Sequence, residues 1–116
     1  MPSAFGIALT ALKAFDRKLD VNANNVANVE TNNFKKSRVE LQEAANGGVT
    51  VTINRVDAPG MEIAPNVRTG EAQQTSNVSL EEEIANQIVD RYSYEANILT
   101  VKTAAEMQKE LLDIKA

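Results

Sequence analysis

Apolar residues in the first quarter of the chain recur at alternating steps of three and four positions. This spacing places them on one face of a helix and predicts a helix over 3–29 with a heptad seam. Ser3 lies at the start of this helix and is expected to cap it. The seam consists of Phe5, Ala8, Leu12, Phe15, Leu19, Asn22, Val26 and Val29. The charged residues off the seam are expected to face water or a neighbour: Lys13, Asp16, Arg17, Lys18 and Asp20.

A second helix is predicted over 79–115. Its mostly apolar stripe follows the helical period and consists of Ala85, Ile88, Val89, Tyr92, Ala96, Leu99, Thr103, Met107, Leu111 and Ile114. Ser79 with Glu82 predicts a capping box, and the acidic run Glu81–Glu83 lies at the positive end of the helix dipole. Such a helix spans on the order of 50 Å, which is too long to bury in a domain of this size. The hypothesis is that it pairs with the first helix and that both continue into contacts with other subunits.

The first helix leaves two interpretations open. At about 27 residues it is long for so small a chain, since most helical stability comes from packing an apolar face. It either packs only on its own domain, or it pairs with a partner helix.

Between the helices the apolar period changes to two. Residues 38–42 and 49–54 alternate between apolar and polar side chains, on either side of Asn46-Gly47-Gly48. Asn-Gly suits the positive φ angles of a tight hairpin turn, so two antiparallel strands are predicted. A turn at 57–60, a short third strand at 61–63 and an extended polar loop over 64–76 are expected to follow.

The expected fold is therefore mainly α with a small β element. Long N- and C-terminal helices pair in a coiled-coil-like manner and are joined by a middle segment with a β-hairpin. We divide the chain into an N-terminal helix with its Asn-rich end (1–34), a variable middle segment (35–76) and a C-terminal helix (77–116).

Composition narrows the function classes. A length of 116 residues has room for one domain, and an aromatic content of 4% predicts a thin core. The net charge of −4 argues against nucleic-acid binding. The absence of Cys and His excludes disulfides, thiolate catalysis and Cys/His zinc sites. No apolar stretch is long enough to span a bilayer, and the first residues lack the pattern of a secretory signal. We expect a cytoplasmic protein, or one handled by an exporter that reads no cleavable signal.

Residues with catalytic potential form no convincing site, so no catalytic residue, cofactor or metal is expected. Three consecutive residues such as Glu81–Glu83 point in different directions from a helix and cannot converge on a metal. Gly47-Gly48 lacks the pattern of a phosphate-binding loop. Asp90 and Arg91 are expected on the helix surface, where ion pairs contribute little.

Six asparagines lie within twelve residues, from Asn22 to Asn33. Asparagine is a poor helix former because its side chain competes for backbone hydrogen bonds. One interpretation is a frayed helix end followed by Asx turns. The other is a set of amides that bond across helix interfaces and to the following bend. The resemblance described next favours the second.

The stretch Ala23–Lys36 resembles the N-terminal signature of the rod and hook proteins of the bacterial flagellum. The matching residues are Asn24, Asn25, Val26, Ala27, Asn28, Thr31, Phe34 and Lys35. One departure is Asn33, which stands where the family usually has glycine; because Asn tolerates a left-handed backbone, the bend is expected to survive. The stretch 76–114 is similar to the family's closing helix. Its matching residues are Ser76, Asn77, Val78, Glu82, Tyr94, Glu95, Ala96, Asn97, Lys102, Thr103 and Met107.

The resemblance implies a structural subunit of the flagellar basal-body rod, most like the short proximal-rod members. Its terminal helices would form the inner layer of the axial tube that transmits torque from motor to hook, with the middle segment farther out. The implied partners are other rod proteins, further copies of itself and the flagellar type III export apparatus, which exports without a cleaved signal; nucleic acid and membrane insertion are not expected. The expected assembly interface comprises Leu12, Phe15, Leu19, Asn24, Asn25, Val26, Asn28, Thr31, Phe34, Ile88, Tyr92, Tyr94, Glu95, Asn97, Leu99 and Met107.

A second hypothesis stays open. The chain could be a cytoplasmic helical adaptor or regulator of flagellar export or assembly that shares the rod motif. Retention in the cytoplasm of a cell with a working exporter would favour this alternative.

Overall fold

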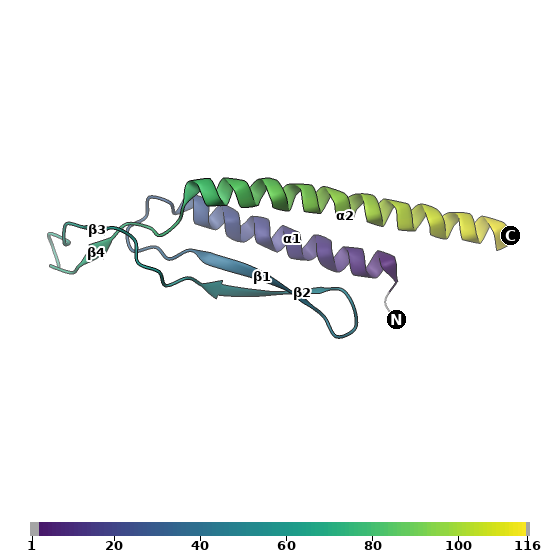
Figure 1. The fold of residues 1–116 in the computed structure, drawn as a ribbon, viewed down its shortest axis with the longest axis horizontal. Helices are drawn as coiled ribbons and strands as arrows, with labels where there is room; N and C mark the ends of the chain where they lie inside the picture. Colours follow the sequence, from purple (N-terminus) through teal and green to yellow (C-terminus); the bar gives the residue numbers. More distant parts are fainter. Residues whose placement is uncertain (1–2, 116) are drawn as a thin grey trace.

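The computed structural model describes residues 3–115 as an elongated body of 76 × 26 × 18 Å. Two helices run along its length, α1 (Ala4–Ala27) and α2 (Leu80–Lys115). A hairpin of strands β1 (Ser37–Glu43) and β2 (Val49–Arg55) lies along the other side of α1 (Figure 1). With 53% helix and 16% strand, the predicted mainly α fold with paired terminal helices and a β-hairpin is confirmed.

The predicted cap of the first helix is present. Ser3 has an extended backbone, and its Oγ accepts a hydrogen bond of 3.1 Å from the Gly6 N–H. This bond satisfies one of the backbone donors that the first turn leaves without a helical partner. The helix ends at Ala27, two residues before the predicted end.

The buried face of α1 differs from the predicted seam. Ala8, Ala11, Ala14, Asn22 and Asn25 are buried, whereas the larger seam residues are only half-buried: Phe5, Leu12, Phe15, Leu19, Val26 and Val29. The reason is that α1 packs against α2 on one side and the hairpin on the other (Figure 1). A single heptad seam is the pattern of a helix that packs against one partner. Here the small alanine side chains allow both α2 and the hairpin to approach α1 closely.

The hairpin has the predicted alternation but a wider turn. Its register pairs Val39 with Ile53 and Leu41 with Val51. The connecting loop has five residues, Ala44 to Gly48, and positive φ angles occur at Gly47 (85°) and Gly48 (90°) but not at Asn46. The prediction of a tight turn at Asn46-Gly47 is therefore wrong.

The turn of the hairpin is held against α1. Thr10 Oγ1 accepts a 3.0 Å hydrogen bond from the Val49 N–H. A Cβ added to Gly48 would lie only 2.7 Å from the same Oγ1. Glycine is needed at 48 for two reasons: the backbone there is left-handed, and the loop approaches the helix too closely for a side chain.

A second, smaller hairpin completes the middle segment. The predicted third strand is present as β3 (Glu62–Ile63). It pairs antiparallel with β4 (Gln73–Gln74), which lies within the region expected to be a loop. The two short strands carry the loop 64–72 at the end of the body opposite the C-terminal end of α2 (Figure 1).

The predicted capping box of α2 is only partly formed. The Glu82 N–H lies 3.5 Å from Ser79 Oγ, which is long for a hydrogen bond. The Glu82 carboxylate instead forms an ion pair of 3.3 Å with Lys36. Neither helix of residues 3–115 has a run of apolar sequence sufficient to cross a bilayer.

The bend between α1 and β1 depends on Asn33. Its φ of 64° makes it the one non-glycine residue of the described chain with a positive φ, which confirms the expected left-handed position. Its N–H donates to the Gln74 carbonyl at 2.8 Å, and its Oδ1 accepts from the Gln74 N–H at 2.9 Å. One residue thus joins the end of α1 to β4.

Substitutions at Asn33 should separate backbone strain from hydrogen bonding. Both Asn33→Ala and Asn33→Gly remove the amide that bonds Gln74, but only alanine is strained at a positive φ. We expect Asn33→Ala to lower the free energy of unfolding, measured by urea titration, by about 1 kcal/mol more than Asn33→Gly. Equal losses for the two variants would contradict a left-handed backbone at this residue.

Candidate assembly interface

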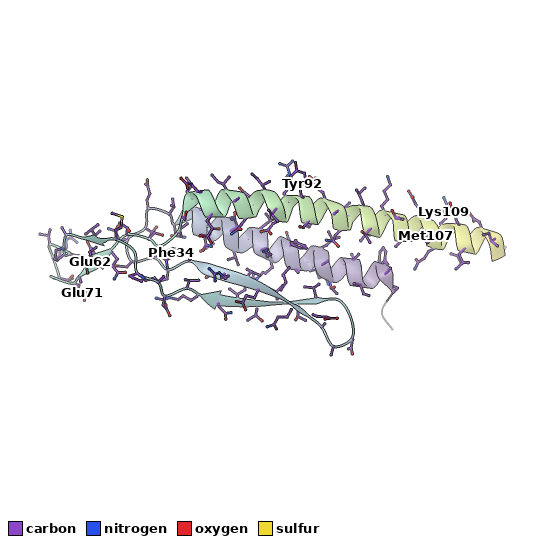
Figure 2. The ribbon with its side chains drawn as sticks, viewed as in Figure 1. Phe34, Glu62, Glu71, Tyr92, Met107 and Lys109 are labelled. Carbon is purple, nitrogen blue, oxygen red and sulfur yellow. The ribbon has the colours of Figure 1, made fainter. Side chains whose placement is uncertain are left out.

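The apolar stripe of α2 is largely exposed to solvent. Ile88, Tyr92 and Leu99 are 53%, 70% and 63% exposed. Tyr92 projects from the side of α2 opposite α1 (Figure 2). We call this exposed set, with Ile84, the outer face of α2; Ile84 is also exposed.

The side of α2 that packs on α1 is mostly polar. Glu83 and Asp90 are buried, and Asn97 and Ala104 are half-buried. These four residues are spaced by seven, so they form one heptad seam. The predicted pairing of the helices is present, but it uses this seam and leaves the outer face uncovered.

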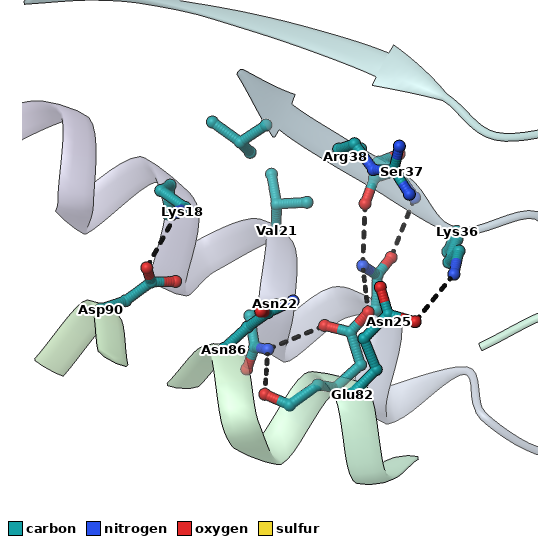
Figure 3. A pocket seen from close by; sticks show the side chains of 12 residues that line it. Lys18, Val21, Asn22, Asn25, Lys36, Ser37, Arg38, Glu82, Asn86 and Asp90 are labelled. Carbon is teal, nitrogen blue, oxygen red and sulfur yellow. Dashed lines mark hydrogen bonds and ion pairs between the residues drawn. The ribbon is translucent and has the colours of Figure 1, made fainter. Parts of the chain in front are cut away.

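One end of this seam is a buried junction of three elements. Asn22 Nδ2 donates to the Glu83 carbonyl and to Glu83 Oε2, both at 2.8 Å. Asn25 Nδ2 donates to the Ser37 carbonyl at 2.9 Å and to Glu83 Oε1 at 3.2 Å. The Ser37 N–H returns a 3.0 Å bond to Asn25 Oδ1. The junction of Asn22, Asn25 and Glu83 thereby ties α1, β1 and α2 together (Figure 3).

The second polar pair of the seam joins Lys18 and Asp90. Their Nζ and Oδ1 atoms lie 2.9 Å apart, and the Asp90 side chain is 2% exposed (Figure 3). The expectations that Asp90 lies on the helix surface and that Lys18 faces water or a neighbour are therefore wrong. Opposite charges from α1 and α2 make the burial tolerable and help to fix the antiparallel register. Arg91 does lie on the surface, 3.4 Å from Glu95.

Residues from the two terminal signatures meet beside this junction. Asn77 Oδ1 accepts a 2.7 Å bond from the Lys36 N–H, and Asn77 Nδ2 donates to the carbonyls of Val56 and Ala58. The Asn77 N–H also donates to the Phe34 carbonyl at 3.3 Å. Asn77 thus connects the bend after α1, the end of β2 and the approach to α2.

Two family models match the parts of the chain that carry this geometry. "Flagella basal body rod protein" matches residues 5–35, and "Flagellar basal body rod FlgEFG protein C-terminal" matches residues 70–114. Together they cover about two thirds of the chain.

This chain belongs to the flagellar basal body rod family.

Membership of the rod family establishes a structural, flagellar rod-type protein of the basal body. The family is a structural component and not an enzyme family. No curated protein matches the chain.

The expected interface residues of this rod-family protein fall into three groups. Asn25 is buried. The half-buried ones are Leu12, Phe15, Leu19, Val26, Asn28, Phe34, Tyr94 and Asn97. The exposed ones, free to contact another subunit, are Asn24, Thr31, Ile88, Tyr92, Glu95, Leu99 and Met107. Sequence reasoning missed Glu83, Asp90 and Lys18, although the spacing of seven from Glu83 to Ala104 could have revealed the seam.

The asparagine cluster at the end of α1 has divided roles. Asn22 and Asn25 bond across to α2 and β1, and Asn33 bonds to β4, so these amides act between elements. Asn28 acts locally: its Nδ2 donates to the Asn24 carbonyl, and its Oδ1 accepts from the Thr31 hydroxyl at 3.0 Å. The interpretation of the amides as bonds between elements is therefore confirmed for Asn22, Asn25 and Asn33, whereas the bonds of Asn28 are local and are not those of an Asx turn.

The acidic run at the start of α2 directs its side chains to different partners. Within residues 3–115 no group of acidic residues is arranged to hold a metal ion. Glu83 points to Asn22 and Asn25, while Glu82 pairs with Lys36. The three side chains diverge, as helical geometry requires.

Burial of the Glu83 carboxyl makes the stability of the fold depend on pH. Desolvation raises the pKa of the Glu83 carboxyl above its ordinary value of 4.5, against the hydrogen bonds from Asn25 and Asn22, which lower the pKa. A pKa that is higher in the folded state means that the folded protein binds this proton more tightly than the unfolded chain. The stability that Glu83 contributes is therefore complete below pH 4.5 and is lost as the pH rises through the raised pKa.

This linkage predicts a difference between wild type and Glu83→Gln. The free energy of unfolding of the wild type should fall, relative to that of the variant, as the pH rises from 4 through the raised pKa. Urea titrations over a pH series measure this difference, and other carboxyl groups cancel because both proteins carry them. Parallel pH profiles would contradict a raised pKa at Glu83.

Proposed function

We propose that this chain is a structural subunit of the flagellar basal-body rod, which assembles through its paired terminal helices into the axial tube that transmits torque from motor to hook. Its partners would be other rod proteins and further copies of itself. The observation that carries this proposal is the outer face of α2: its apolar side chains are exposed, while the two α2 side chains most deeply buried against α1 are the carboxyls of Glu83 and Asp90.

The outer face has the chemistry of an interface between helices. Ile84, Ile88 and Tyr92 recur every four residues and Leu99 follows after seven, so they line one side of a helix of 36 residues. An exposed apolar patch of this length marks a site of protein association. Because these side chains are exposed in the folded chain, another subunit can reach the outer face without unfolding this one.

The thin core supports export through the flagellar type III apparatus. Within residues 3–115 the buried apolar side chains are small: Ala8, Ala11, Ala14 and Val78. Such a core contributes little hydrophobic stability, because the free energy gained scales with the apolar area buried. A weakly held subunit unfolds readily for passage through an exporter and gains stability when neighbours cover its outer face.

Fractionation of purified hook–basal bodies, with mass spectrometry for this chain, tests the proposal. We expect the chain in that fraction at a stoichiometric level. Its absence there, with the protein abundant in the cytoplasm, would overturn the proposal and leave the adaptor of flagellar export or assembly as the better explanation.

A further inference from the structure

The hydrogen bonds of the β1–β2 hairpin show which backbone groups point out of it. At the end of the ladder the Val56 N–H donates to the Lys36 carbonyl at 2.9 Å, and the register continues from this pair. Because successive residues of a strand alternate in direction, even-numbered residues bond across the hairpin and odd-numbered residues point outward. Ser37 agrees with this assignment, since both of its backbone groups bond the Asn25 side chain of α1.

On β2 the outward direction leaves a free edge. We call it the β2 edge; it consists of Val51, Ile53 and Arg55. The N–H and C=O groups of these residues have no hydrogen-bond partner within residues 3–115, and β2 lies along the margin of the molecule opposite α2 (Figure 1). The strand has no bulge, lysine or proline, which are the usual means of protecting an edge. Since the free groups recur at every second residue, an extended strand is the backbone that matches them.

A hollow of about 350 Å³ lies between this edge and α1. Ile53 lines it from β2, and Arg17, Asp20 and Asn24 line it from α1. These three α1 residues are exposed and lie on the opposite side of the helix from Asn22, which bonds α2. Arg17 and Asp20 form no ion pair within residues 3–115, so the hollow carries two unpaired charges of opposite sign.

We propose that the β2 edges of two copies of this chain pair antiparallel about a two-fold axis at Ile53, forming a four-stranded sheet with both α1 helices on one face. Ile53 exchanges backbone bonds with Ile53 of the second copy, and Val51 does so with Arg55, so every free group of the edge is used. The contact is isologous and closes on itself. It also supplies the additional strands that a two-stranded sheet lacks for stability in water.

The spacing of the pair suits the helices. Each α1 packs on both strands of its own hairpin. The midlines of the two hairpins lie two strand spacings apart in the pair, about 10 Å. This is a distance at which helices pack directly, so the two α1 helices meet over the centre of the sheet.

Charge favours a second copy as the occupant of the edge. The two-fold axis makes the α1 helices antiparallel and brings Arg17 of each copy within reach of Asp20 of the other. Lys13, one turn earlier on α1, approaches the uncharged Asn24 of the second copy. Arg55 is already paired with Asp57 of its own chain at 3.1 Å.

The solvent face of the paired strands adds no repulsion. The even-numbered side chains of β2 are neutral: Thr50, Thr52 and Asn54. The nearest charges of β1 on that face are Arg38 and Glu40, which lie one strand farther from the axis and have opposite signs.

Sedimentation of the purified full-length protein over a range of concentrations tests the pairing. We expect a monomer–dimer equilibrium that Ile53→Pro weakens at least about tenfold more than Ile53→Ala, because symmetry removes two backbone bonds at once. Both variants lose the isoleucine, but only proline lacks the outward N–H. This N–H is not used inside the hairpin, so circular dichroism should show both variants folded. A wild type that stays monomeric at about 1 mM, or equal dimerisation of the two variants, would overturn the proposal.

A charge exchange tests the two-fold arrangement of the helices. Asp20→Arg places like charges together at both symmetric positions and should weaken the dimer about tenfold. Arg17→Asp/Asp20→Arg restores opposite charges and should restore the dimer. Equal dimerisation of the single and double variants would contradict the antiparallel approach of α1.

Disulfide trapping tests the register, because the chain has no cysteine of its own. In the pair Thr52 lies opposite Asn54 of the second copy, with Cα atoms about 4.5 Å apart, within the range of a disulfide. Thr52→Cys mixed with Asn54→Cys should form an oxidised heterodimer. Each variant alone places its two cysteines beyond the roughly 7 Å limit and serves as the control. Equal trapping of homodimers and heterodimer would overturn the axis at Ile53.

This pairing does not rest on the rod function, because it is measured on the purified protein. Absence of the chain from hook–basal bodies would overturn the rod proposal and leave the pair in place. A failure of the pair would leave the rod proposal unchanged.

Discussion

Replacing Asn25 with alanine is expected to lower the free energy of unfolding by about 3 kcal/mol, the largest loss for any single amide of this chain. The Asn25 side chain is 2% exposed and bonds both backbone groups of Ser37 as well as Glu83 Oε1. Alanine would leave these groups without their partner at a position where the side chain is almost fully buried. The contact between α1 and β1 and the contact between α1 and α2 would weaken together.

The neighbouring residue supplies the control. Asn24 is exposed, and its side chain makes no hydrogen bond within residues 3–115. Asn24→Ala should change stability by no more than about 0.5 kcal/mol, as for most surface substitutions. Urea titration of the two variants measures the difference, and a similar loss for both would show that the junction does not hold the three elements together.

Replacing both Tyr92 and Leu99 with glutamate is expected to remove the chain from the rod without unfolding it. Both side chains are exposed on the outer face, so the fold loses little when they change. In an assembled rod, however, each glutamate would place a charge in an apolar interface, at a cost of several kcal/mol. We expect at least about a tenfold loss of the chain from hook–basal bodies, since each 1.4 kcal/mol changes an association constant tenfold.

Gln87→Glu is the matched control for this variant. It also adds a negative charge to an exposed position of α2, but it removes no apolar side chain. Circular dichroism and urea titration should give near wild-type folding for both proteins, and only the double variant should be lost from hook–basal bodies. Normal incorporation of Tyr92→Glu/Leu99→Glu would show that the outer face is not an assembly surface.

Local sequence determined the elements of this protein. The change from helical to alternating apolar spacing separated the two helices from the hairpin, and Ser3 marked the start of α1 within one residue. Asn33 was expected to keep a left-handed backbone in place of the usual glycine, and it does. These features depend on a few neighbouring residues, whose steric and hydrogen-bonding preferences act without the rest of the fold.

The width of the first hairpin turn was less predictable. Asn46-Gly47 is typical of a two-residue turn, but the strands separate after Glu43 and leave a loop of five residues. The contacts of Gly48 and Val49 with Thr10 of α1 favour this wider loop. A preference of turn residues is small enough for a tertiary contact to override it.

The faces that the helices bury could not be read from apolar spacing. A helical period shows that apolar residues share a side, but it does not say whether that side meets the same chain, another subunit or solvent. In α2 the apolar side is left open, and the intramolecular seam is built from Glu83, Asp90 and Asn97.

By itself, then, the sequence determined the helices, the hairpin, the bend at Asn33 and the rod family. Only the tertiary structure decided which side of α2 stays free for partners, because carboxylates can be buried there only where Asn22, Asn25 and Lys18 of α1 lie opposite them. That pairing joins positions about sixty to seventy residues apart in sequence, and its energy exists only when both helices are in place.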